Sequence, residues 1–380
     1  MAIKNQSYLL TSLLSLLLSG CDDNLELITE PKNKEIKHVY PAPRGQYKVG
    51  VNEFDVKGYS KDSVSPNSDE LRKIHFKIHY PADGYHENYS TYFDKLGNQV
   101  DYLKSKRPKE ARLHPLQHDL NTMWSWSVEN ANIIKHEGAG WPVLFYSHGL
   151  ALFENDNTEL VEDLVSHGFI VVSVNHTYLS GVTTFENGQI ANLYLPNDKH
   201  DVGTPIGRTY FDEVVSPQIS NDVQNIYNWM LWNQWRLNDQ VDLSNVGTLG
   251  YSLGASAAMN SCKSLFFCKA SVNIDGLVLG EAAKKPLNKP LLLLSSENSL
   301  AQLDSTFNFN LAETHLITIE NSTHDDFYDL NRWIVGLPTA IAPDKIHNII
   351  KGKINNFFQN KLNHTELVFS EEDGVVILSK

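Results

Sequence analysis

The residues with the clearest chemical potential are residues 250–254, which read Gly-Tyr-Ser-Leu-Gly. They match the pattern G-x-S-x-G and lie between an apolar run that ends at Leu249 and a helical pattern that begins at Leu253. In this strand–turn–helix context the pattern predicts a sharp turn, with strained backbone angles at the serine and small neighbours around it. The turn would present the Ser252 hydroxyl beside a helix N-terminus, which stabilises a developing negative charge. Ser252 is therefore the candidate nucleophile.

A serine hydroxyl is a weak nucleophile, so it needs a general base, and the base needs a carboxylate to orient it. Enzymes with this turn, the α/β hydrolases, carry the three residues in the order serine, acid, histidine. Among the histidines that follow Ser252, His315 begins a predicted strand, and His347 lies inside the last predicted helix. His324 lies in a polar loop directly after the predicted strand at residues 316–319. We predict that His324 is the base.

Two carboxylates compete for the role of the acid. Asp275 follows the predicted strand at residues 270–274, and Glu297 follows the one at residues 291–294. Use of the later strand in many hydrolases favours Glu297, whereas aspartate is the commoner residue, so spacing alone leaves both open. A structural role at the end of a strand is the alternative for each.

The oxyanion of the intermediate needs two backbone N–H donors, one after the serine and one from an earlier strand–helix loop. The first donor falls on Leu253. Residues 147–150, Ser-His-Gly-Leu, supply that loop and place the second donor at Leu150. His148 and His176 also suggest a metal site, but histidines at strand ends more often hydrogen-bond to the scaffold. We therefore predict neither a metal nor a cofactor.

After Trp141 the predicted strands and helices that would position these residues alternate regularly. Continuous apolar runs alternate with helical spacing, which is typical of a mostly parallel sheet with helices on both faces. The predicted strands are at residues 143–146, 169–174, 246–249, 270–274, 291–294 and 316–319, and the helices are at residues 160–165 and 219–231 and from residue 253 onward.

Two further patterns flank this core. Residues 73–80 alternate between apolar and polar, which predicts a half-exposed strand. An apolar stripe from Ile346 to Leu362 predicts a C-terminal helix that packs on the core, with a helix lying on a membrane as the alternative.

Composition narrows the class of protein. The chain has 380 residues, 41% of them hydrophobic, and a net charge of −13. This is ordinary globular usage, which excludes disordered and fibrous classes. The acidic balance disfavours binding to nucleic acid. Three cysteines are too few for a disulfide scaffold or a cysteine-rich zinc module.

The N-terminus predicts export and a lipid anchor. Lys4, an apolar run at residues 8–18 and a small-residue cleavage site make a secretory signal peptide, and the run is too short to span a bilayer. Residues 18–21, Leu-Ser-Gly-Cys, resemble the lipobox of bacterial lipoproteins, in which the cysteine is acylated and becomes the first residue. We therefore expect Cys21 to anchor the chain in a membrane of the bacterial cell envelope, facing the periplasm or the exterior. The choice between inner and outer membrane stays open.

The two remaining cysteines, Cys262 and Cys268, lie where a predicted helix ends and a strand begins. Disulfides persist outside the cytoplasm, so the two cysteines could form a local disulfide or remain two buried thiols, and the sequence leaves both alternatives open. The predicted organisation is a signal peptide at residues 1–20, a tether at 21–40, one catalytic domain at 41–362 and a C-terminal tail at 363–380. The domain carries insertions at about residues 84–138 and 178–217.

Several stretches of the chain, in order, resemble the platelet-activating factor acetylhydrolases of the plasma and intracellular type II group. They are residues 43–51, 145–150, 166–171, 175–176, 250–254, 274–276 and 322–327. The resemblance implies the α/β-hydrolase fold, a triad acid at Asp275 rather than Glu297, and oxyanion donors at Leu150 and Leu253. The chain departs from the family pattern in two places: Ala151-Leu152 replaces a second glycine, and Gly-Tyr-Ser-Leu-Gly-Ala replaces Gly-His-Ser-Phe-Gly-Gly.

The triad and the resemblance together predict a serine ester hydrolase that cleaves short-chain or oxidised acyl esters of phospholipids through an acyl-enzyme. A broad carboxylesterase or a polyester hydrolase is the alternative, and the departures from the family pattern leave the head-group preference open. A catalytically silent envelope lipoprotein is the alternative from a different class. The oligomeric state is not determined by the sequence.

Overall fold

The structure, a computed structural model, describes residues 37–83, 88–106, 120–299, 303–334 and 336–380. These residues belong to one unit, Ile36–Lys380. The predicted signal peptide and the anchor residue Cys21 lie outside the described residues. No helix in the described part of the chain is both long and apolar enough to cross a membrane.

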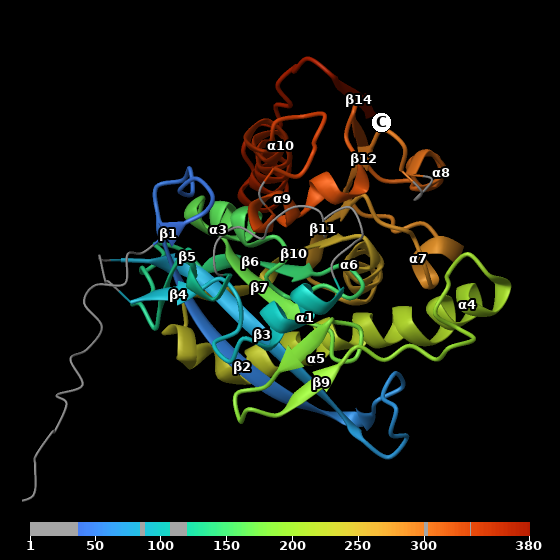
Figure 1. Cartoon of the computed structure of the whole chain (residues 1–380). Helices are drawn as coiled ribbons and strands as arrows, with labels where there is room; N and C mark the ends of the chain where they lie inside the picture. The colour runs from blue at the N-terminus through green and yellow to red at the C-terminus, as the bar shows by residue number, and fades with distance from the viewer. Residues whose placement is uncertain (1–36, 84–87, 107–119, 300–302, 335) are drawn as a thin grey trace, which may run out of the picture. The chain divides into compact units, whose positions relative to one another are not determined.

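One large mixed sheet organises the unit (Figure 1). Its strands are, in sheet order, β1 (Lys37–His38), β5 (Met123–Glu129), β2 (Lys48–Lys61), β3 (Leu71–Ala82), β7 (Ile170–Asn175), β6 (Trp141–Ser147), β10 (Val241–Tyr251), β11 (Cys268–Ile274), β12 (Leu291–Ser296), β13 (Thr314–Ile319) and β14 (Val375–Ser379), with β4 (Tyr89–Thr91) paired to β5. The strands from β7 to β13 run parallel, whereas β3 pairs antiparallel with both β2 and β7. A separate hairpin joins β8 (Val182–Thr184) to β9 (Ile190–Asn192).

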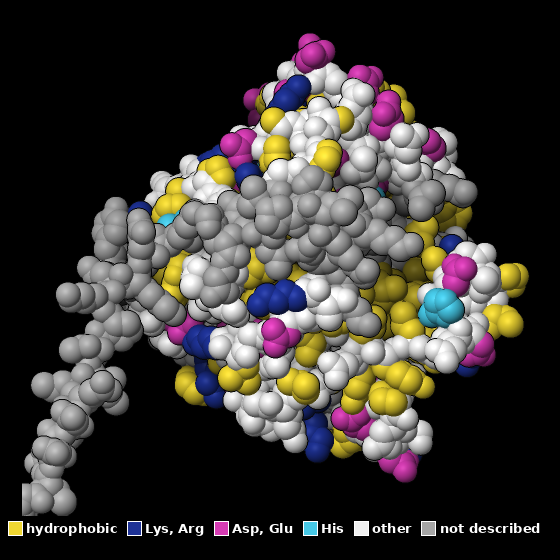
Figure 2. Space-filling view, viewed as in Figure 1, with side chains coloured by type: hydrophobic (Ala, Val, Ile, Leu, Met, Phe, Trp, Pro, Cys, Tyr) yellow, Lys and Arg dark blue, Asp and Glu magenta, His cyan; other side chains and the backbone are white. Residues whose placement is uncertain are grey.

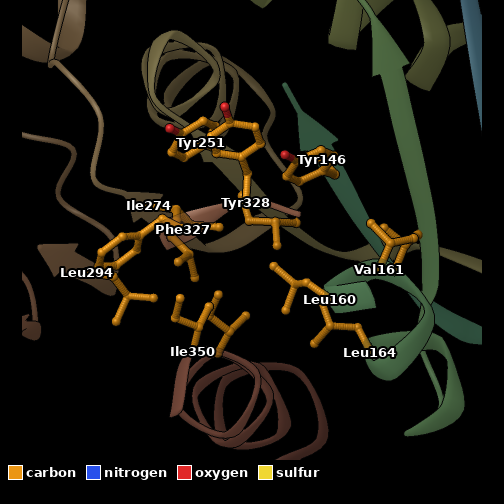
Figure 3. Packing of buried hydrophobic residues seen from close by; sticks show 14 of the residues in the cluster. Tyr146, Leu160, Val161, Leu164, Tyr251, Ile274, Leu294, Phe327, Tyr328 and Ile350 are labelled. Carbon is orange, nitrogen blue, oxygen red and sulfur yellow. The ribbon is translucent and has the colours of Figure 1, made fainter. Parts of the chain in front are cut away.

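Helices cover both faces of the sheet, which is why the central strands read as continuous apolar runs. On one face, α3 (Thr158–Ser166) and α10 (Pro343–Asn363) pack against strand residues such as Tyr146 and Ile274 (Figure 3). On the other face, α5 (Ser216–Asn233) and α6 (Leu253–Ser264) cover β3, β6 and β7. The shorter helices are α1 (Asn98–Lys106), α4 (Pro205–Tyr210), α7 (Glu281–Lys284), α8 (Leu303–Phe309) and α9 (Leu330–Trp333). The predicted fold class is confirmed.

The apolar stripe of α10 packs on the core as predicted, because Ile346, Ile350 and Ile354 are buried against α3 and the central strands. In contrast, the prediction of a half-exposed strand at residues 73–80 is wrong. Both faces of β3 are buried from Ile74 onward. Its polar face is compensated by charge: Lys77 Nζ lies 3.2 Å from Glu53 Oε1 and 3.6 Å from Glu154 Oε1.

Both predicted ends of the catalytic domain need correction. The expected tail at residues 363–380 contains β14, which pairs antiparallel with β13. The expected tether at residues 21–40 reaches into the sheet, because β1 pairs with β5 and the Tyr40 hydroxyl donates to Glu162 at 2.7 Å. The expected insertion at 84–138 likewise contributes β5 to the sheet. Short edge strands have too few residues for a clear period, so their pairing is set by hydrogen bonds to a neighbour.

The two cysteines beyond the N-terminal region form a disulfide between the last turn of α6 and the first residue of β11. Cys262 and Cys268 are both buried, and their Cα atoms are 5.1 Å apart. The disulfide closes a short loop, residues 263–267, at the end of the sheet where β11 begins.

Removing this cross-link should destabilise the folded unit, because the unfolded chain then gains conformational entropy. For so short a loop, we expect the Cys262→Ala/Cys268→Ala variant to lose about 2 kcal/mol of unfolding free energy, measured by urea denaturation without reductant. Wild-type protein unfolded in the presence of a reductant serves as the control and should approach the variant. Equal unfolding free energies with and without reductant would contradict the prediction.

Candidate active site

A single residue, Ser252, joins β10 to α6. Its backbone angles, φ 54° and ψ −118°, are strained for a residue with a side chain, and its amide donates to the Ile274 carbonyl at 3.0 Å. The turn is possible only because two neighbours are glycine. A Cβ on Gly250 would lie 2.1 Å from the Gly254 carbonyl oxygen, and a Cβ on Gly254 would lie 2.0 Å from the Ser147 carbonyl oxygen.

The structure brings the three predicted triad residues together at one edge of the sheet. His324 Nε2 lies 3.0 Å from Ser252 Oγ, and His324 Nδ1 lies 2.8 Å from Asp275 Oδ2. The carboxyl ends of parallel strands meet at the same edge, so residues that follow β10, β11 and β13 become neighbours. Glu297, the competing acid, instead accepts a hydrogen bond from the Asn321 amide at 3.2 Å. The geometry therefore selects Asp275 as the partner of the imidazole.

Asp275 is held by groups at the end of β12. The Ser296 amide donates to its Oδ1 at 2.9 Å, and the Ser296 hydroxyl donates to its Oδ2 at 2.9 Å. Burial raises the pKa of Asp275, but hydrogen bonds from the His324 and Ser299 side chains and from the Ser296 amide outweigh it and hold the pKa below its ordinary value. The carboxylate thus stays ionised and can orient the imidazole.

An aromatic stack supports His324 from one side. The Tyr251 ring stacks on the imidazole with centroids 4.8 Å apart, and Tyr328 stacks on Tyr251 at 5.1 Å; Figure 3 shows both tyrosines at the edge of the core. The Tyr251 hydroxyl also donates to the His324 carbonyl at 3.0 Å. A capping box between Thr323 and Asp326 orders the turn that carries the histidine. Sequence reasoning missed this stack, because no spacing rule relates residues 251 and 328.

The two predicted oxyanion donors are the backbone amides of Leu253 and Leu150. Leu253 is the first residue of α6, and Leu150 follows β6. Neither amide donates a hydrogen bond to another described residue outside its own element. The side chains of both leucines belong to an apolar cluster with Tyr178, Val214 and Leu277. Figure 2 shows hydrophobic side chains lining a hollow beside α4 on the face in view.

His148 orients the Leu150 amide through the backbone. The His176 amide donates to His148 Nε2 at 3.0 Å, so Nε2 is the acceptor and Nδ1 carries the hydrogen, which it donates to the Gly149 carbonyl at 2.6 Å. Because the peptide group is planar and trans, a fixed Gly149 carbonyl aims the Leu150 N–H in the opposite direction. Burial, with a contribution from His176, lowers the pKa of His148 to about 3, so the ring is neutral near pH 7.

A buried ion pair fixes the position of His176, which contacts His148. His176 Nδ1 lies 2.9 Å from Asp222 Oδ2, and Arg72 donates to both oxygens of Asp222, at 2.8 Å and 2.5 Å. Arg72 also donates to Asp62 at 2.8 Å. Backbone groups occupy both nitrogens of His148, which supports the predicted scaffold role of this histidine.

A second buried cluster has the composition of a metal site but carries its own cations. Oxygen and nitrogen atoms of Glu159, Asp329 and His347 lie within 4.8 Å of one another. Arg332 donates to one oxygen of Glu159 at 2.8 Å, and Lys351 donates to the other at 2.6 Å. Two cations thus contact Glu159, which indicates a structural ion network that ties α3 to α9 and α10.

We expect the buried ion pair between Arg72 and Asp222 to contribute to the free energy of unfolding. Replacing Arg72 with methionine leaves Asp222 buried without its cation, and we expect a loss of about 3–5 kcal/mol at pH 7, measured by urea denaturation. An Arg208→Met variant removes a half-exposed ion pair with Asp212 and should lose less than about 1 kcal/mol.

The loss should depend on pH. Burial raises the pKa of Asp222, but the charge of Arg72 and the hydrogen bond of His176 lower it to about 2, below the value of about 4 in the unfolded chain. Stability from the pair is therefore complete above about pH 4 and disappears as the pH falls through about 2. The difference between wild type and Arg72→Met should shrink over that interval, and a constant difference would contradict the assignment.

Comparison with known proteins gives matches in sequence and in fold. The family described as "Platelet-activating factor acetylhydrolase, isoform II" matches residues 33–199. Platelet-activating factor acetylhydrolase of Bos taurus is 23% identical over 219 residues, which cover 50% of this chain and 49% of that protein. The protein of the same name from Gallus gallus is 22% identical over 278 residues, 62% of each chain. The chain thus spans about half to three fifths of the length of the curated relatives it matches.

A solved structure extends the match in fold to nearly the whole chain. A ferulic acid esterase from Streptomyces cinnamoneus superposes with a TM-score of 0.73 at 18% sequence identity, covering 89% of this chain and 98% of that one. At this identity the likeness shows the fold alone. The chain is thus similar in sequence to the platelet-activating factor acetylhydrolase family over residues 33–199, and its fold is the α/β-hydrolase fold.

Proposed function

We propose that the chain is a serine ester hydrolase that works through an acyl-enzyme. The observation that carries the proposal is the continuous array Asp275–His324–Ser252, with contacts of 2.8 Å and 3.0 Å. Ser252 Oγ attacks the ester carbonyl while His324 Nε2 takes its proton, and the Leu150 and Leu253 amides hold the oxyanion. His324 then returns the proton to the leaving alcohol, and water releases the acyl group by the same steps in reverse.

The proposed substrates are short-chain or oxidised acyl esters of phospholipids. The match to the family model supports this class, and so does the apolar cluster around Leu150 and Leu253, which suits an acyl chain better than a charged group. A broad carboxylesterase is the second candidate. It is favoured by the departures from the family pattern beside the site, where Ala151 and Tyr251 replace a glycine and a histidine.

We further propose that Cys21 carries the lipid that anchors the chain in the bacterial cell envelope. The support is the lipobox-like sequence at residues 18–21 and the small number of cysteines, of which the other two are paired with each other. A membrane-anchored enzyme would meet esters released from the same membrane.

A fluorophosphonate probe tests the nucleophile directly. Wild-type protein should be labelled at Ser252, and Ser252→Ala should not be labelled and should lose at least about 10⁴-fold in kcat. A Ser261→Ala variant, which alters a serine buried within α6, serves as the matched control. Equal labelling of wild type and Ser252→Ala would disprove the assignment and leave the silent lipoprotein as the better interpretation.

A pair of substrates separates the two candidate functions. We expect kcat/KM for an acetylated lysophospholipid to equal or exceed that for nitrophenyl butyrate, because both place a short acyl chain at the apolar cluster. Hydrolysis of the nitrophenyl ester with no release of acetate from the phospholipid would favour the broad carboxylesterase.

His148 gives a second kinetic prediction, because it acts on the oxyanion through the Gly149 carbonyl. His148→Ala should lower kcat for nitrophenyl butyrate by about 10²-fold, close to the loss of one oxyanion donor, with KM little changed. His200→Ala, at an exposed loop position, is the control. A rise in KM with kcat preserved would mean that His148 shapes the binding site instead.

A further inference from the structure

The loop closed by the disulfide presents two aromatic rings to solvent. Phe266 is 88% exposed and Phe267 is 39% exposed, and their rings meet edge to face with centroids 5.1 Å apart. We call these two residues the aromatic tip. The disulfide between Cys262 and Cys268 fixes both ends of the loop, so the tip is held in place without a core to bury it. Adjacent exposed aromatic side chains of this size commonly mark an interaction surface.

Five lysines flank the aromatic tip in the sequence, within residues 263–289, and we call them the lysine ring. They are Lys263, Lys269, Lys284, Lys285 and Lys289. Among residues 262–290 the acidic side chains are Glu281 and Asp275, and Asp275 lies at the opposite end of β11. This concentration of positive charge stands out in a chain whose net charge is −13.

Hydrogen bonds to the backbone hold two of these lysines against the loop. Lys289 Nζ donates to the carbonyls of Cys262 and Leu265, at 2.6 Å and 3.0 Å. Lys263 Nζ donates to the Lys285 carbonyl at 2.8 Å, which brings the segment after α7 beside the loop. Glu281 lies 3.8 Å from Lys284 and 3.4 Å from Lys285, so one glutamate offsets part of this charge.

The apolar surface continues past the lysine ring. Asn310 donates to the Lys289 carbonyl at 3.1 Å and accepts from the Asn288 amide at 3.0 Å, which seats the turn after α8 beside Lys289. In that turn Leu311 is 79% exposed. Aromatic and aliphatic side chains are thus interspersed with lysines along one end of the sheet.

We propose that the aromatic tip and the lysine ring bind a lipid bilayer that carries anionic headgroups. Aromatic side chains settle at the boundary between headgroups and acyl chains, and lysines beside them attract anionic lipid. Charge complementarity is what selects this partner, since an acidic chain as a whole is repelled by an anionic surface. The proposal is independent of the proposed hydrolase activity.

The position of this surface sets the orientation of the bound protein. The aromatic tip precedes β11, and Asp275 follows it, so the length of β11 separates them. Seven residues of strand span about 20 Å. The triad lies at the carboxyl edge of the sheet and the aromatic tip at the amino edge, so a chain docked through the tip presents its triad away from that bilayer.

Vesicle binding tests the proposal with the full chain carrying Cys21→Ser, so that no acyl chain is attached there. We expect co-sedimentation with phosphatidylcholine vesicles that contain about 30% phosphatidylglycerol to exceed that with pure phosphatidylcholine by at least about tenfold in partition coefficient. Phe266→Ser and the triple variant Lys269→Gln/Lys284→Gln/Lys285→Gln should each lower partition into the anionic vesicles by about tenfold. The N-terminal residues are common to all these chains, so differences between variants report on the loop.

Matched controls distinguish binding through this surface from nonspecific hydrophobic binding and from an effect of net charge. Tyr59→Ser removes a fully exposed aromatic ring on β2, and Lys57→Gln/Lys104→Gln/Lys345→Gln removes three exposed lysines elsewhere. Both controls should bind as the parent chain does, and thermal unfolding midpoints should show that every variant is folded. Equal partition into neutral and anionic vesicles would overturn the proposal, as would equal losses in the test and control variants. Failure of all the chains to bind would also overturn it and point to a protein partner for the aromatic tip.

Discussion

The strained turn at Ser252 is the constraint on which the site depends. One residue reverses the chain between β10 and α6, and it does so at a positive φ that a side chain normally avoids. The turn brings α6 so close to the end of β6 that only glycine fits at position 254. This close approach places the first amide of α6 beside the loop that carries Leu150, so the geometry that exposes the nucleophile also assembles the proposed oxyanion site.

Groups far away in the sequence maintain that geometry. Asp275 depends on Ser296 at the end of a neighbouring strand, and the loop at Leu150 depends on His148, which is held by the His176 amide. Behind His176 lies the ion pair between Asp222 and Arg72, which comes from α5 and β3. Buried polar groups of this kind are costly unless every partner is present. The sheet therefore supplies rigidity to the reactive edge through polar contacts as well as through apolar packing.

The two edges of the parallel sheet differ in character. The carboxyl edge carries the triad and an apolar cluster, and the amino edge carries exposed phenylalanines among lysines. In a parallel sheet all strand ends of one kind meet at one edge, so residues from separate segments accumulate there without being close in sequence. For an enzyme proposed to be anchored in a membrane, this separation allows one edge to contact lipid while the other remains open to substrate.

The amino-acid sequence by itself determined the features that follow from local patterns of residues. The apolar runs of β6, β7 and β10–β13, the stripe of α10 and the motif around Ser252 all follow from short-range periodicity, and His324 follows from its place after a strand. Only the tertiary structure decided between Asp275 and Glu297, paired Cys262 with Cys268, and placed β1, β5 and β14 in the sheet. It also revealed Tyr251 stacked on the imidazole and His148 behind the Leu150 amide. Apart from the disulfide, whose cysteines are six positions apart, those features depend on contacts between residues dozens of positions apart, and local pattern carries no information about such contacts.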